Sequence, residues 1–374
     1  MGAEQAAPVS PDRLRDFVSA VYRSTGVPEA DAAFVADTLV QADLWDHQSH
    51  GVLRVGWYYA RLRSGAMLPV TQPRTVVDAG AIAVIDGQDG VGQMVAKHAI
   101  EEAVRRAKLH GVGVVSVRNS NHFGTCMYYT GMGAKAGCIT LLATNGGPNM
   151  APWGGMKKMI GTNPWSVAAP AGRHPTMIMD MAVSGVARGK IFLAQQRREP
   201  IPDTWAIDRQ GFPTTDAREA LEGFILPMAG HKGYAIGVIV DMLSGVLSGS
   251  SFLDGVHGPY DPVNRSGAGH FFAAFNVDAF QPRAQFDARM EEYIARLKAV
   301  PVAPGHDEVF YPGEIEARKD AKHRREGLLL PRDTLADLER VGREAGVPVA
   351  LLDWGSLAAD GYLSAGMRKP GEAG

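Results

Sequence analysis

The chain has 374 residues and a mass of 40.0 kDa, enough for two or three domains or for one large discontinuous domain. Hydrophobic residues make up 45% of it and charged residues 21%, a balance that is typical of globular proteins and too apolar for disorder. Its 38 Lys and Arg against 40 Asp and Glu give a formal net charge of -2, which argues against a protein that binds nucleic acid or a membrane surface.

Hydrophobic periodicity predicts helices at both ends of the chain and alternating strands and helices between them. We expect helices over residues 9–25, 28–45, 49–63, 93–110, 125–136, 233–248, 284–298 and 332–345. Strand-like runs cover residues 75–86, 112–117, 138–144, 165–170, 176–182 and 271–280. The segment 145–215 is dense in Gly, Pro, Asn and Trp, and it departs most from simple alternation.

Features that would place the chain outside the cytoplasm are missing from the sequence. Cys126 and Cys138 form no CxxC pair, and we expect both to be reduced. The first residues lack the basic and apolar regions of a signal peptide. The most apolar stretch, residues 233–249, is broken by Asp241 and is too short to span a bilayer. The sequence therefore predicts a cytoplasmic protein.

Glycine is over-represented, with 44 residues, and one cluster imitates a dinucleotide-binding fingerprint. Gly87, Gly90 and Gly92 lie between a strand-like run and a helix, where such a fingerprint belongs. The position of its third glycine holds Val95, which would crowd the helix against the strand, and the next strand-like run ends in Arg118 rather than an acid. We interpret this segment as a tight strand-to-helix turn and not as a Rossmann-type site.

A polar cluster opens the third predicted helix. Ser49 can serve as its N-cap, and His50 and Arg54 are four residues apart, on one helical face. Arginine binds a carboxylate through two hydrogen bonds, and histidine exchanges a proton near neutral pH. This pair suits a keto-acid or hydroxy-acid substrate, although a solvated helix start explains the same residues.

A second histidine, His122, comes just after the strand-like run 112–117, in the polar turn 119–124. Catalytic groups often gather in turns that a rigid scaffold positions. A histidine that caps the next helix is the alternative explanation.

Three further segments have the chemistry of a nucleotide site. Asp180 ends a strand-like run, where an acid can bond a ribose hydroxyl or pair with a base. His231 and Lys232 begin a helix, whose free N–H groups and positive dipole favour a phosphate. The loop 161–164, which contains Thr162, is shaped by its proline. Ordinary turn chemistry remains the alternative for each of them.

Taken together, the motifs resemble the type-2 malate/L-lactate dehydrogenase family, whose members are NAD(P)-dependent oxidoreductases without a Rossmann fold. The family includes malate, sulfolactate and ureidoglycolate dehydrogenases, diketogulonate reductase and cyclic-imine carboxylate reductases. The matching motifs run in order over about residues 30–330: SHGVLR at 49–54, DGQDGVGQ at 86–93, SNHFG at 120–124, GTNP at 161–164, MDMAVSGVARGKI at 179–191, WAIDRQGFPTTD at 205–216, GHKGY at 230–234 and PGE at 312–314.

This resemblance implies roles for particular residues. His122 matches the proton acceptor, His50 the proton donor of some members, and Arg54 the arginine that binds the carboxylate. Ser49 and Asn121 become further substrate contacts. The implied cofactor contacts are Asp180, Met181, Ala182, His231, Lys232, Gly313 and Glu314, with Thr162 near the nicotinamide pocket.

The resemblance also implies an α/β (mixed α+β) fold with a largely antiparallel or mixed sheet in the cofactor domain. The expected units are an N-terminal helical segment (1–75), a discontinuous core domain (76–125 and 310–350), a cofactor-binding domain (126–309) and a tail (351–374). A small carboxylate substrate and a homodimer follow by the same resemblance. The expected cofactor is NAD, with NADP as the alternative, and no metal ion is expected.

Three other functions remain open at this point. A reductase of a cyclic imine carboxylate, such as a pyrroline or piperideine carboxylate, needs the same arginine and hydride but protonates nitrogen. A metal-dependent hydrolase would use His47, His50 and His122, but the chain has no HExxH motif. A non-catalytic cofactor-binding protein would leave the pair of histidines unexplained.

Overall fold

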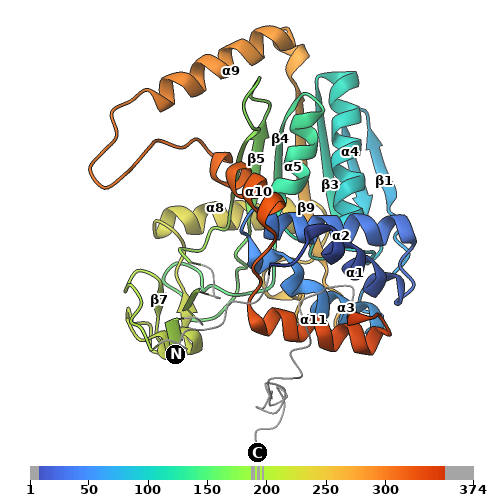
Figure 1. Cartoon of the computed structure of the whole chain (residues 1–374), viewed down its shortest axis with the longest axis vertical. Helices are drawn as coiled ribbons and strands as arrows, with labels where there is room; N and C mark the ends of the chain where they lie inside the picture. The colour runs from blue at the N-terminus through green and yellow to red at the C-terminus, as the bar shows by residue number, and fades with distance from the viewer. Residues whose placement is uncertain (1–7, 187–189, 192–193, 196–197, 350–374) are drawn as a thin grey trace, which may run out of the picture.

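The structure, a computed structural model, describes residues 8–186, 190–191, 194–195 and 198–349. At its centre is a seven-stranded sheet in the order β1-β2-β3-β9-β4-β5-β6 (Figure 1). Within it β2 and β3 are parallel and all other neighbours are antiparallel. The strands are β1 Arg74–Ala79, β2 Ile82–Asp86, β3 Val112–Ser120, β4 Cys138–Thr144, β5 Trp165–Ala169, β6 Met177–Met181 and β9 Ala268–Asn276.

Helices cover both faces of this sheet. On one face lie α4 (Gly92–His110), which links the parallel strands, and α5 (Cys126–Lys135). On the other lies α8 (His231–Asp241), which continues as a π-helix, η3 (Met242–Val246). Two consecutive residues of β9 contact opposite faces of the sheet. Gly269 packs against Ser244 of η3 on one face, and His270 contacts Phe123 on the other.

A helical layer packs beside the sheet and joins the two ends of the described chain (Figure 1). Its helices are α1 Pro11–Arg23, α2 Glu29–Leu44, α3 Val55–Ser64 and α11 Arg332–Ala345. They share one hydrophobic cluster, and Val9 pairs with Leu328 through two backbone hydrogen bonds. The first helical residues and the last ones therefore form a single core.

The segment between β6 and α8 packs with Met150 and Ile160, from the loop before β5, in a separate hydrophobic cluster. It holds the two-stranded β7–β8 sheet, Ala206–Ile207 with Phe224–Ile225, and the short helix α7, Ala217–Glu222. Asp216 caps α7 by accepting hydrogen bonds from the amides of Arg218 and Glu219. After β9, a 3₁₀ turn (Val277–Ala279) leads to α9 (Arg283–Lys298), which projects beyond the sheet in Figure 1.

Most of the predicted elements are confirmed, and the predicted mixed fold is confirmed with them. Two corrections concern helices. The helix predicted at 49–63 begins as two 3₁₀ turns, η1 Gln48–His50 and η2 Val52–Arg54, because Gly51 between them has extended torsion angles (φ -86°, ψ -147°). The short helix α7 and the helix α10 (Glu314–Glu326) were not predicted.

In the part of the chain that the structure describes, no helix has both the length and the apolar character needed to cross a membrane. The division of the chain into domains stays a prediction, and the tail beyond residue 350 lies outside the described residues.

The glycine-rich segment after β2 is the tight turn that the sequence predicted. It joins the end of β2 to the start of α4 and packs against the turn that carries His122. A Cβ atom on Gly92 would lie 2.3 Å from the His122 carbonyl oxygen and 2.4 Å from that of Asn121. Glycine is required here for close approach of two backbone segments, not for binding a phosphate.

We predict that Gly92→Ala lowers the free energy of unfolding by about 1–3 kcal/mol and displaces His122, because backbone atoms must move to admit the methyl group. Thermal unfolding and turnover measure both effects. Gly131→Ala is the matched control. Gly131 lies inside helix α5, and its Cβ would be 3.5 Å from the Ile178 side chain, which is an ordinary van der Waals contact. Unchanged stability and turnover in Gly92→Ala would contradict the assignment.

Candidate active site

His122 lies in a short turn between the end of β3 and the start of α5. Gly124 allows this turn with a φ of 89°. The Nδ1 atom of His122 lies 2.5 Å from the Tyr58 hydroxyl and 3.2 Å from the Gly124 amide nitrogen. With Nδ1 engaged by protein groups, Nε2 is the nitrogen left to meet a ligand.

His50 and Arg54 reach the same place from the two 3₁₀ turns after α2. Asp43, near the end of α2, holds this segment by accepting the Val52 amide at 2.8 Å. A Cβ on Gly51 would overlap the Asp43 carboxyl group, so glycine is required at that position too. Burial raises the pKa of the Asp43 carboxyl to about 8.

The expectation that Ser49 caps a helix is wrong. The α3 helix begins six residues later, and the Ser49 hydroxyl instead lies 2.9 Å from Nδ1 of His50. His50 and Arg54 are brought together by the break at Gly51 rather than by one continuous helical face.

The two histidine rings are stacked, with centroids 5.6 Å apart and planes inclined by 24°. Burial, together with the charge of Arg54, lowers the pKa of His50 to about 3. Burial also holds the pKa of His122 well below its usual value, with added effects from Arg54 and His50. Both rings are therefore neutral at neutral pH in the ligand-free protein, which is the state that can accept a proton.

Arg54 is arranged as an anion-binding group. Its Nε donates to the Ser49 carbonyl at 2.7 Å, and its guanidinium lies over the Trp57 ring at 4.4 Å. Its two terminal nitrogens have no hydrogen-bond partner among the residues that the structure describes. A planar fork with two free donors, held by stacking, suits a carboxylate.

The side chain of Asn121 is used entirely by the protein. It is buried, donates to the carbonyls of Asp89 and Gly90 at 3.1 and 2.8 Å, and accepts from Arg61 at 2.9 Å. Its position therefore differs from that of the expected substrate contact. It fixes the His122 turn to the glycine-rich segment.

Several residues of this site were missed by the sequence reasoning. Arg61 is almost fully buried and donates to the carbonyls of Asp261 and Asn264, which fixes the loop 257–266 beside the histidines. Tyr260 of that loop meets Trp57 edge to face at 6.2 Å. No motif identifies this loop, and only the buried arginine reveals its importance.

The expected cofactor segments meet along one edge of the sheet. Thr162, before β5, accepts the Val183 amide at 2.9 Å, and Val183 in turn accepts the Met228 amide just before α8. This ladder places the Asp180–Ala182 segment beside the start of α8, where His231 and Lys232 are exposed. The Pro312 carbonyl accepts the Ile178 amide at 3.0 Å and brings the PGE segment to the same strand.

Asp180 also links these segments to the histidines. Its carboxylate accepts the Met127 amide at the start of α5, at 2.7 Å, five residues beyond His122. Burial raises its pKa to about 6, against the lowering effect of that hydrogen bond. A buried carboxylate at the start of a helix is stabilised by the helix dipole.

Glu314 is placed differently from the other expected cofactor residues. Its carboxylate is buried between Lys298 at 2.8 Å and Arg318 at 2.6 Å, and these partners hold its pKa below its usual value. Gly313, with a φ of 90°, lines a cavity of about 320 Å³ between α2, α5, β6 and α10. The glycine thus remains accessible, while the glutamate forms an ion-pair network.

Unsatisfied polar atoms show that this region fits a polar cofactor. Thr125 Oγ1, Ser184 Oγ and His270 Nε2 are buried without a hydrogen-bond partner among the described residues. The first two amides of α8 also lack a hydrogen-bond partner among the described residues, as is usual at a helix start. Buried groups of this kind are rare unless a ligand or water completes them, and a nicotinamide dinucleotide offers amide, hydroxyl and phosphate partners.

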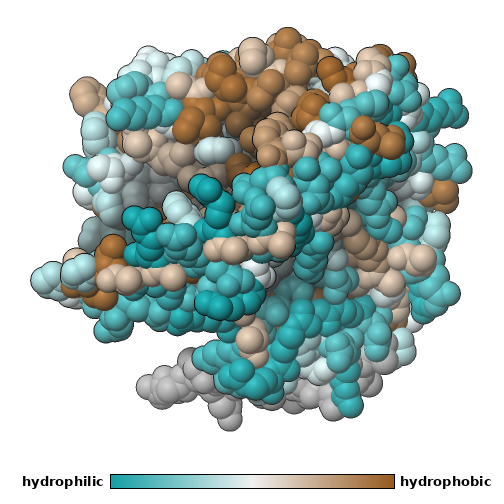
Figure 2. Space-filling model, turned by 90° about the horizontal axis from the view of Figure 1, so that it is seen from above, coloured by the Kyte–Doolittle hydropathy of each residue, from teal (hydrophilic) through white to brown (hydrophobic). Residues whose placement is uncertain are grey.

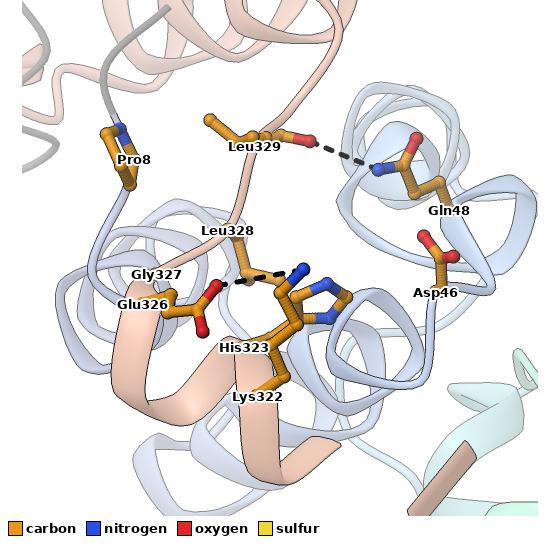
Figure 3. A pocket seen from close by; sticks show the side chains of 9 residues that line it. All are labelled: Pro8, Asp46, Gln48, Lys322, His323, Glu326, Gly327, Leu328 and Leu329. Carbon is orange, nitrogen blue, oxygen red and sulfur yellow. Dashed lines mark hydrogen bonds and ion pairs between the residues drawn. The ribbon is translucent and has the colours of Figure 1, made fainter. Parts of the chain in front are cut away.

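A separate cavity of about 320 Å³ borders the segment before His50 (Figure 3). None of the expected site residues lines it. Gln48 donates to the Leu329 carbonyl at 3.1 Å across one side of this cavity, and His323 lies 2.9 Å from the Leu44 carbonyl. These contacts hold the segment 44–48 in place from α10 and the chain after it.

In the described ranges, no group of three or more His, Cys, Asp or Glu side chains is arranged to hold a metal ion. These described residues therefore offer no metal site for the metal-dependent hydrolase considered above.

Comparisons with known proteins place this geometry in context. The model of the malate/L-lactate dehydrogenase family matches residues 9–339. The L-sulfolactate dehydrogenase of Methanocaldococcus jannaschii is 37% identical over 91% of this chain and 98% of its own, and its solved structure superposes with a TM-score of 0.88 over 93% of this chain and 99% of its own. The malate dehydrogenase of Pyrococcus abyssi is 36% identical over 90% of this chain and 94% of its own.

A more distant structure bears on the imine alternative. The delta1-piperideine-2-carboxylate reductase of Pseudomonas syringae pvar. tomato is 25% identical and superposes with a TM-score of 0.78 over 89% of this chain and 99% of its own.

The fold and the site thus define an oxidoreductase that moves a hydride between a nicotinamide and a small 2-hydroxy or 2-keto acid. The chain belongs to the malate/L-lactate dehydrogenase family, as its motifs indicated. The similarity to hydroxy-acid dehydrogenases exceeds the similarity to the imine reductase, which favours a hydroxy acid over a cyclic imine.

Proposed function

We propose that this dehydrogenase interconverts a malate-, lactate- or sulfolactate-like 2-hydroxy acid and its 2-keto acid, with NAD as cofactor. The observation that carries the proposal is the arrangement of Arg54 and the two histidines. The two terminal nitrogens of Arg54 are free, and His50 and His122 are stacked and neutral. Such a site binds a carboxylate and takes up a proton from the adjacent carbon's hydroxyl group. A cytoplasmic location remains a prediction from the sequence.

Each of three side chains has one task in this mechanism. Arg54 holds the substrate carboxylate and so fixes the adjacent carbon. His50 hydrogen-bonds the reacting oxygen or the carboxylate. His122 accepts the hydroxyl proton at Nε2 during oxidation and returns it during reduction.

The bound nicotinamide supplies or receives the hydride, which is chemistry that belongs to the cofactor. The residues proposed to hold it are Thr162, Asp180, Met181, Ala182, His231, Lys232, Gly313 and Glu314. Of these, Lys232 at the start of α8 suits a phosphate, whereas Glu314 would act through its ion-pair network.

The substrate can be found with a matched panel. We expect turnover with at least one short 2-hydroxy acid and NAD, followed by the absorbance of the reduced nicotinamide. The amide of the same acid should react at least about 100-fold more slowly, because it cannot fill the guanidinium fork. Turnover of cyclic imine carboxylates alone would establish the alternative function, an imine reductase. Faster turnover with NADP than with NAD would reverse the proposed choice of cofactor.

Two variants should separate proton transfer from anchoring. His122→Ala should lower kcat by roughly 10²–10⁴-fold, since it removes the acid–base group. Arg54→Lys should mainly raise KM, because a point charge cannot reproduce two parallel hydrogen bonds. Near-normal turnover in His122→Ala, or an unchanged KM in Arg54→Lys, would overturn the respective role.

We further propose a homodimer, as the family resemblance implies. An apolar stripe supports it, because five large apolar residues along α8, η3 and the position after η3 are exposed: Val238, Ile239, Met242, Val246 and Leu247. On the face shown in Figure 2, apolar side chains also gather along one edge and hydrophilic ones cover the opposite part. Light scattering should give a mass near twice the 40.0 kDa of one chain, and Val246→Glu should halve it. A wild-type mass of 40.0 kDa would refute the dimer.

A further inference from the structure

A row of three stacked side chains joins the loop 257–266 to Arg54. The Arg54 guanidinium lies over the Trp57 ring, 4.4 Å from its centroid. Trp57 in turn meets Tyr260 of the loop edge to face, with ring centroids 6.2 Å apart and planes at 85°. The group that receives the substrate carboxylate is therefore connected, through two aromatic rings, to a segment far away in the sequence.

We propose that Tyr260 is a positioning residue whose ring holds Trp57 against Arg54, so that the loop 257–266 sets how tightly the substrate carboxylate is bound. This inference rests on the proposed anchoring role of Arg54. Tyr260 acts through Trp57 and takes no part in the transfer of the proton or the hydride.

Arg54 needs this support because its side chain is long and flexible. Ordering such a side chain when a ligand binds costs conformational entropy, and a side chain that is already ordered avoids that cost. The hydrogen bond from Nε to the Ser49 carbonyl, at 2.7 Å, fixes one edge of the guanidinium. The Trp57 ring fixes its plane, because a cation is attracted to the face of an indole. The two terminal nitrogens are then held in the orientation that two parallel hydrogen bonds to a carboxylate require.

Trp57 in turn needs a partner outside its own helix. It lies in the first turn of α3 and is partly exposed. Tyr260 supplies the contact, with a separation and an angle that are favourable for a pair of aromatic rings. Arg61, one helical turn after Trp57, donates to the carbonyls of Asp261 and Asn264. The same helix that presents Trp57 therefore also holds the loop that carries Tyr260.

The loop is internally braced to carry this ring. Its ends are joined by a hydrogen bond from the His257 amide to the Ser266 carbonyl, at 2.9 Å, and by one from the Ser266 hydroxyl to the His257 carbonyl, at 2.8 Å. The Asp261 carboxylate accepts two further amides of the loop, at 2.9 and 3.0 Å. A Cβ on Gly258 would lie 2.8 Å from the Tyr260 ring, so glycine allows the ring to pack back on its own loop.

The test replaces Tyr260 in two ways and measures KM and kcat for the carboxylate substrate. Tyr260→Leu should raise KM about 2- to 10-fold, the size of an aromatic pair contact, while kcat changes little because the reacting groups stay in place. The inhibition constant of oxamate, a 2-keto acid analogue that accepts no hydride, should rise by the same factor. Tyr260→Phe should keep both values, because the ring and not the hydroxyl contacts Trp57. Tyr260 is 57% exposed, so neither variant opens a cavity in the core.

Two controls make the result specific. Tyr293→Leu removes a tyrosine of similar exposure, 53%, from α9, and it should leave KM unchanged. Trp57→Leu should raise KM at least as much as Tyr260→Leu, and combining the two should add nothing, because Tyr260 acts only through Trp57.

A wild-type KM in Tyr260→Leu, or an equal rise of KM in Tyr260→Phe, would overturn the inference. An unchanged KM in Arg54→Lys would instead overturn the anchoring role on which it rests. The same measurements apply if the substrate is a cyclic imine carboxylate, since its carboxylate would bind the same guanidinium.

Discussion

The contact of two backbone segments at Gly92 is the constraint on which the catalytic geometry depends. The start of α4 lies so close to the carbonyls of Asn121 and His122 that no side chain fits between them. Asn121 secures the same contact with two hydrogen bonds to the glycine-rich turn. Because α4 is packed on the sheet, the position of His122 is set by the core rather than by a flexible loop.

A second fixed point brings the other catalytic candidates to this turn. The buried Asp43 accepts the Val52 amide and occupies the space that a side chain at position 51 would need. The chain is thereby bent between His50 and Arg54. The His50 ring stacks on that of His122, and the charge of Arg54 acts on the same ring. Rigid elements on two sides of the site hold its groups in place, which is what an oriented hydride transfer requires.

The sequence predicted much of this, and the failures have physical causes. Periodicity located most elements because their buried faces repeat at helical or strand spacing. The helix α10 escaped because its one buried residue is the charged Glu314, so it shows no apolar periodicity. Ion pairs such as Glu314–Arg318 and Asp320–Arg324 stabilise it instead. Tyr58 and Arg61 escaped because a buried polar partner has no signature in a single sequence.

The neutral histidines beside a free guanidinium also suggest how binding and proton transfer are coupled. In the ligand-free protein, burial and the charge of Arg54 both oppose protonation of His122. A substrate carboxylate on Arg54 would neutralise that charge, so the pKa of His122 should rise when substrate binds. The ring would then accept the hydroxyl proton more readily in the complex than in the empty site. Arg54 would thus anchor the substrate and, through its charge, prepare the base that acts on it.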